Sequence, residues 1–114
     1  MSVIGDIAKT LSEPKEIDVS DLGVEGVEKL QFKFLSSSEM GVLLSHPEYK
    51  SAKTKEQRDL ILNQLLVHAM LSKCDETVTL SEVKSLPFDV LAKISNRMME
   101  MMDVQGEFLK NLQD

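Results

Sequence analysis

The sequence predicts a mainly α-helical fold: a small helical bundle with a short two-stranded β-hairpin near the N-terminus. Apolar residues recur at three- and four-residue steps through most of the chain after residue 36, which is the spacing of one helix face. Two short segments before residue 36 instead alternate apolar and polar side chains, as half-buried strands do. Since 114 residues suit one domain, we expect these elements to share one core.

Four consecutive parts are expected within this domain. Residues 1–14 should hold an N-terminal helix, residues 15–35 a hairpin region, residues 36–104 the helical core and residues 105–114 a C-terminal extension. The boundaries follow the changes of hydrophobic period along the chain.

The N-terminal part carries helical spacing and the next part carries strand alternation. Residues 2–12 are expected to form a short amphipathic helix that ends before Pro14. Strands are expected at about 15–20 and 28–35. Because a two-stranded hairpin is only marginally stable alone in water, its apolar face should lie on a helix.

The helical core begins with a capping sequence. Ser36 and Glu39 have the spacing of a capping box, which predicts a short helix from this point. That helix should end near His46 and Pro47, because proline disfavours a helical residue before it. Residues 46–53 are therefore expected to form a loop.

A long helix is expected over residues 54–74, where Thr54 and Gln57 repeat the capping spacing. Apolar residues cover more than half of its girth, which is typical of a helix at the centre of a bundle. The stripe contains Ile61, Leu62, Leu65, Leu66, Ala69 and Met70, and is widened by Leu60, Val67 and Leu71.

Two further helices are expected after a polar break. A capping box beginning at Thr79 predicts a short helical turn at 80–85. Ser85 is expected to cap a final helix that starts at Pro87, since proline is tolerated in a first turn. This helix should reach about residue 104, and Gly106 is expected to break or bend it.

The final helix carries the most informative pattern in the chain, an apolar stripe rich in methionine. Its members fall at three- and four-residue steps: Leu91, Ile94, Met98, Met101, Phe108 and Leu112, with Gln105 the one polar member. Met99 lies off the stripe and is expected to be the most exposed. The chain's own core or another chain must cover the stripe, since each large apolar side chain gains roughly 1.5–3 kcal/mol on burial.

Composition argues against several classes of protein. A net charge of −6 disfavours nucleic-acid binding, which depends on surplus Lys and Arg. We expect no signal peptide and no membrane span, because no basic N-terminal region precedes a long apolar run and no run approaches ~20 residues. The single Cys74 cannot form an internal disulfide, which fits a reducing cytoplasm.

The sequence carries no recognisable catalytic motif. His46 and His68 lack the spacing of metal ligands. We expect His46 to lie in a loop and His68 to be a hydrogen-bonded residue of the core or its boundary. The glycines form no phosphate-binding loop. We therefore expect a non-enzymatic protein with no catalytic residues, no cofactor and no metal site.

Several segments follow one another in an order that is informative: Asp21-Leu22-Gly23, Leu30 to Glu39, Arg58 to Leu71, and Ser81 to Pro87 leading into a helix through Ile94 and Met98. In this order, over about residues 16–106, the chain resembles the tail assembly chaperones of long-tailed bacteriophages. The resemblance implies a mainly α-helical fold in the cytoplasm of a host bacterium. It also implies a role in coating the hydrophobic tape-measure protein and delivering tail-tube subunits.

Two hypotheses follow for the methionine-rich stripe. In the first, a chaperone holds amphipathic helices of the tape-measure protein, and the expected partner-binding residues are Met98, Met99, Met101, Met102, Phe108, Leu109 and Leu112. In the second, the same stripe joins copies of the chain into a structural or adaptor homo-oligomer that has no client. A regulatory DNA-associated protein is a third class, which the acidic charge disfavours.

Overall fold

A computed structural model describes the backbone of residues 2–113 and the side chains of residues 2–101. Helices dominate, and the one sheet is a two-stranded antiparallel hairpin, so the predicted fold class is confirmed within this part of the chain. The elements are α1 (Val3–Leu11), β1 (Lys15–Asp18), the 3₁₀ helix η1 (Ser20–Leu22), β2 (Lys29–Phe32), α2 (Ser37–Leu44), α3 (Pro47–Ser51), α4 (Lys55–Ser72), α5 (Leu80–Lys84) and α6 (Phe88–Gln113).

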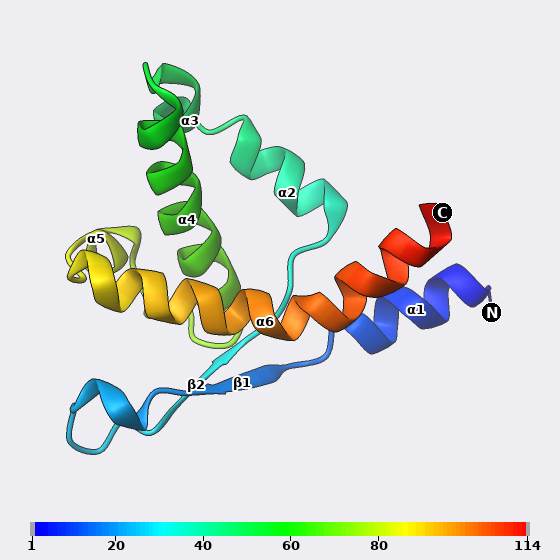
Figure 1. Cartoon of the computed structure of the whole chain (residues 1–114), viewed down its shortest axis with the longest axis horizontal. Helices are drawn as coiled ribbons and strands as arrows, with labels where there is room; N and C mark the ends of the chain where they lie inside the picture. Colours follow the sequence, from blue (N-terminus) through cyan, green and yellow to red (C-terminus); the bar gives the residue numbers. More distant parts are fainter. Residues whose placement is uncertain (1, 114) are drawn as a thin grey trace.

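The hairpin packs its apolar face on the helices, as its marginal stability in isolation requires. Register pairs Ile17 with Leu30 and Asp18 with Lys29. One apolar residue of each strand and one just beyond each strand are buried in the core: Ile17, Val19, Phe32 and Phe34. Leu30 is half-buried and packs against them. Figure 1 shows the hairpin lying across the base of α4 and below α6.

Helix α4 is the central element, as its broad apolar stripe predicted. It contacts α2, α3, α5, α6 and β2. Its buried residues are Leu65, Val67, Met70 and Leu71. The remainder of the core comes from α5 and α6, through Val83, Leu91, Ile94 and Met98. In Figure 1, α4 stands on the long α6, while α2 leans away from α4 and rejoins it through α3.

The caps predicted at Ser36, Thr54 and Thr79 are confirmed. Ser36 accepts a hydrogen bond from the Glu39 backbone N–H at 3.1 Å, and the Glu39 carboxylate accepts one from the Ser36 backbone N–H at 2.9 Å. Thr79 and Glu82 form the same reciprocal pair. These bonds satisfy backbone donors that the first turn of a helix leaves free.

Three local predictions are wrong. Residues 46–53 do not form only a loop, because Pro47 opens the short helix α3. His46 caps α3, since its Nδ1 accepts a hydrogen bond from the Glu48 backbone N–H. Ser85 ends α5, where its hydroxyl donates to the Glu82 carbonyl, and it does not start α6. The expected break at Gly106 is absent, and α6 continues to Gln113, because a single glycine costs a helix only about 1 kcal/mol.

Candidate interaction surfaces

The predicted methionine site is divided between core and surface. Met98 has an exposed fraction of 0% and packs with the core residues Leu91 and Ile94. Met99 is half-buried and packs against the same core, so it is not the most exposed methionine as expected. Met101 is 36% exposed. The chain's own core therefore covers the first part of the stripe, and Met101, the last side chain described, is partly exposed.

The remaining predicted partner-binding residues lie outside the described side chains. These are Met102, Phe108, Leu109 and Leu112. The backbone at these positions belongs to α6.

An apolar groove that the sequence analysis did not predict lies between α2 and α4. We call it the α2–α4 groove, and it holds about 390 Å³. Leu35, Leu43 and Ala69 supply apolar surface, and Val42 stands beside them with an exposed fraction of 72%. The groove exists because α2 leans away from α4 instead of packing along it (Figure 1).

Charged and polar groups at the α2–α4 groove are held in fixed positions. Lys73 Nζ donates to Glu39 Oε1 at 2.7 Å, and this hydrogen bond is the main reason that the pKa of Glu39 is lowered. His68 Nε2 donates to the Val78 carbonyl at 3.1 Å. The expectation that His68 is a hydrogen-bonded residue at the core boundary is confirmed. The α2–α4 groove therefore combines apolar walls with polar groups that already have hydrogen-bond partners.

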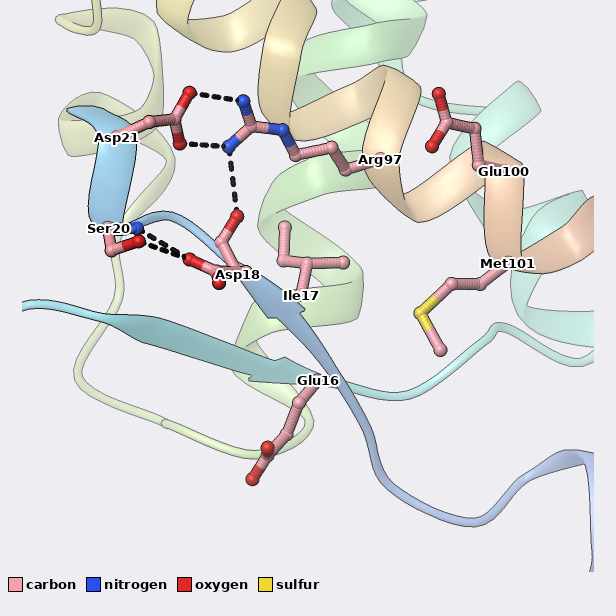
Figure 2. Close-up of a pocket in the computed structure, with 8 residues that line it drawn as sticks. All are labelled: Glu16, Ile17, Asp18, Ser20, Asp21, Arg97, Glu100 and Met101. Atoms are coloured by element: carbon pink, nitrogen blue, oxygen red, sulfur yellow. Dashed lines mark hydrogen bonds and ion pairs between the residues drawn. The ribbon is translucent and has the colours of Figure 1, made fainter.

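A second groove lies between β1 and α6 (Figure 2). We call it the β1–α6 groove, and it holds about 480 Å³. Its lining residues are Glu16, Ile17, Asp18, Ser20, Asp21, Arg97, Glu100 and Met101. Met101 on α6 points toward β1 (Figure 2), so the exposed member of the predicted methionine site borders this groove.

An ion pair closes one end of the β1–α6 groove. Arg97 donates from Nη1 and Nη2 to the two oxygens of Asp21, and from Nη1 also to the Asp18 backbone carbonyl at 2.9 Å. The hydrogen bond from Arg97 lowers the pKa of Asp21. Ser20 donates from its hydroxyl and its backbone N–H to the Asp18 carboxylate, which lowers the pKa of Asp18. Both carboxylates are therefore charged at neutral pH.

Helix α1 presents an apolar face that the described side chains leave open. Val3 and Ile4 are exposed, Ile4 to 75%, and α1 contains no buried residue. A helix whose apolar face is left in water is a frequent site of association with another chain.

No group of three or more His, Cys, Asp or Glu side chains among the described residues could hold a metal ion. Cys74 is a half-buried free thiol. No helix in the described part of the chain has the length and apolar character needed to cross a membrane.

Sequence patterns hold only a partial signal for the two grooves. Helix α2 carries more apolar residues than a short helix can bury on one side, since Val42 and Leu44 both remain exposed. That surplus was a usable signal for the α2–α4 groove. The β1–α6 groove gave none, because it depends on contacts such as Arg97 with Asp21 between residues far apart in the sequence.

The described part of the chain defines a mainly α-helical protein with two open grooves. Comparisons with protein-family models, with curated proteins and with solved structures found no match to the chain.

Proposed function

We propose that this protein is a non-enzymatic phage tail assembly chaperone that binds apolar helices of the tape-measure protein and helps recruit tail-tube subunits. The order of segments in the sequence supports this function by resemblance. The α2–α4 groove supports the binding of helices, because a concave apolar surface between two helices suits the apolar face of a third.

The open α2–α4 groove is the observation that carries the proposal. Burial of Met98 removes the first part of the predicted methionine surface from contact with a client. A client helix nevertheless needs an apolar surface, and the groove supplies one through Leu35, Leu43 and the exposed Val42. Lys73 and Glu39 at its edge would exclude water and fix the client's register without a large gain in affinity.

A capture experiment tests the proposal. Apolar helical fragments of a phage tape-measure protein would be captured on the immobilised full-length chain. Val42→Glu places a charge at the groove and should reduce capture at least about tenfold, since a buried unpaired charge opposes binding.

A matched control variant comes from the start of α6. Phe88 is 73% exposed, almost the same as Val42, and it does not line the α2–α4 groove. Phe88→Glu should therefore capture the fragment as the unmodified protein does. If folded Val42→Glu captures the fragment as well as the unmodified protein does, the α2–α4 groove is not the binding site. If the unmodified protein captures no fragment, the tape-measure protein is not its client.

The exposed face of α1 favours the second candidate function, a structural or adaptor homo-oligomer. Ile4→Glu in the full chain should convert such an oligomer to a monomer in light scattering, because it places a charge on that face. Val24→Glu, at an exposed loop position, is the control. Truncation of residues 104–114 tests by light scattering whether the end of α6 joins the copies. If the unmodified protein is a monomer at high concentration, the homo-oligomer is excluded.

A further inference from the structure

The outer edge of β1 carries backbone groups that point away from the hairpin. Val19 N–H donates to the Glu28 carbonyl at 2.7 Å, so Val19 and, two residues earlier, Ile17 face β2. Residues in an antiparallel pair alternate in the direction of their backbone bonds. The N–H and C=O groups of Glu16 and Asp18 therefore point outward, and the bond from Arg97 to the outward Asp18 carbonyl agrees with this assignment.

The remaining outward backbone groups of β1 are available for hydrogen bonds to another strand. Within the described part of the chain, no backbone hydrogen bond beyond the hairpin engages the Glu16 N–H, the Glu16 carbonyl or the Asp18 N–H. These groups border the β1–α6 groove, where Met101 points from α6 toward β1 (Figure 2). An unpaired strand edge of this kind is a template for another strand.

Charge argues against pairing between two copies of β1. An added antiparallel strand must keep its inward side chains on the face of Ile17, so only registers that preserve this parity are allowed. In the two such registers that pair three residues of β1 with three of its copy, Glu16 or Asp18 lies opposite an acidic residue of the other copy. Like charges directly opposite one another destabilise strand pairs.

Charge also indicates what the edge accepts. Glu16, Asp18, Asp21 and Glu100 line the groove, and its one basic residue, Arg97, is paired with Asp21. On the β2 side, Glu16 accepts a hydrogen bond from Gln31 and lies 3.6 Å from the largely exposed Lys29, so the groove keeps an acidic balance although Glu16 already has one basic neighbour. Lysine or arginine opposite Glu16 and Asp18 would form favourable cross-strand pairs. An apolar side chain between them would point to the same side as Ile17, toward the exposed Met101.

We propose that the β1 edge binds an extended basic segment of a partner protein by antiparallel strand addition, with alternating basic and apolar residues. Main-chain hydrogen bonds to Glu16 and Asp18 supply the binding, and the acidic side chains select the partner. The inference does not rest on the chaperone function, because it uses no residue of the α2–α4 groove.

A peptide series tests the main-chain bonds. The probe is fluorescein-labelled Lys-Val-Lys-Val-Lys-Val-Lys, and its binding to the full chain is followed by fluorescence anisotropy at low salt. In the proposed register the lysine N–H groups face β1 and the valine N–H groups face away. N-methylation of the lysine amides should abolish binding, and N-methylation of the valine amides should preserve it. Equal binding of both, or loss with methylated valines alone, would overturn the proposal.

Charge variants test selection by the edge. Glu16→Lys should weaken binding of the lysine peptide about tenfold and strengthen binding of a matching glutamate peptide. Glu16→Gln, which removes only the charge, should give a smaller loss in the same direction. Glu76→Lys makes the same charge change at an exposed position outside this groove and is the control.

Two outcomes of the charge series would count against the proposal. An equal loss in Glu76→Lys and Glu16→Lys would show attraction by net charge alone. A dimer of the unmodified protein that Glu16→Pro dissolves would assign the edge to a second copy, because that variant removes an outward N–H.

Discussion

The Arg97 guanidinium donates two parallel hydrogen bonds to the Asp21 carboxylate, at 2.7 and 2.6 Å, and so joins α6 to η1. A further bond from Arg97 reaches the Asp18 carbonyl at the end of β1. The hairpin loop is therefore attached to the longest helix by one side chain. Parallel bonds of this kind demand the planar fork of arginine.

Replacement of Arg97 by lysine should loosen the hairpin loop although the charge is kept. A lysine cannot form the paired bonds to Asp21 and also reach the Asp18 carbonyl. We expect a Tm a few degrees lower and faster hydrogen exchange around residues 18–22, with Arg97→Ala lower still. Arg58→Lys, at an exposed position on α4, should leave both unchanged. An unchanged Tm in Arg97→Ala would show that the ion pair contributes nothing to folding.

Acid should destabilise the protein below about pH 5. Hydrogen bonds from Arg97, Lys73 and Lys84 lower the pKa of Asp21, Glu39 and Glu48, whose usual values are 3.8, 4.5 and 4.5. Because these pKa values are lower in the folded state, the stabilisation is complete above the unfolded pKa and is lost as pH falls through the folded pKa.

Urea unfolding between pH 3 and pH 7 measures this dependence. We expect a plateau in the free energy of unfolding above about pH 5 and a decline below it. The decline should be shallower in Asp21→Asn, which no longer has a carboxyl group to protonate at that position. Constant stability down to pH 3, or a decline that begins near neutral pH, would contradict this assignment.

Met98 and Met101 should respond very differently to truncation, although they are one turn apart on α6. Met98→Ala leaves a cavity in the core and should cost about 2–5 kcal/mol of unfolding free energy. Met101→Ala should change it by less than about 0.5 kcal/mol, because the side chain is exposed. Urea unfolding of both variants measures the difference, and equal losses would show that Met101 is also enclosed.

Local signals in the sequence predicted most of the fold. The capping boxes at Ser36 and Thr79 were correct because their bonds join residues three apart. The hairpin was predictable from alternation alone. Pro47 misled because one proline can end a helix or begin the next, and the His46 cap that decides between them is not a common capping residue.

The interaction surfaces were less predictable, because they depend on how far the elements cover each other. Helical spacing placed Met98 and Met101 on the same stripe, and it could not show that the core ends between them. The α2–α4 groove depends on the angle of α2, which a short amphipathic sequence does not determine. The β1 edge depends on which strand remains unpaired in the assembled sheet.

The capping box at Ser36 should contribute measurably to stability and to the position of α2. Ser36→Ala removes the acceptor for the Glu39 backbone N–H and should cost about 1 kcal/mol of unfolding free energy. Ser38→Ala lies in the first turn of the same helix and should be neutral or slightly stabilising, because alanine has the higher helix propensity. Since Glu39 also binds Lys73, loss of the cap should loosen α2 against α4, with faster hydrogen exchange in α2 than in α5. Equal stability of the two serine variants would mean that the bonds to Lys73 and the core determine α2 without its cap.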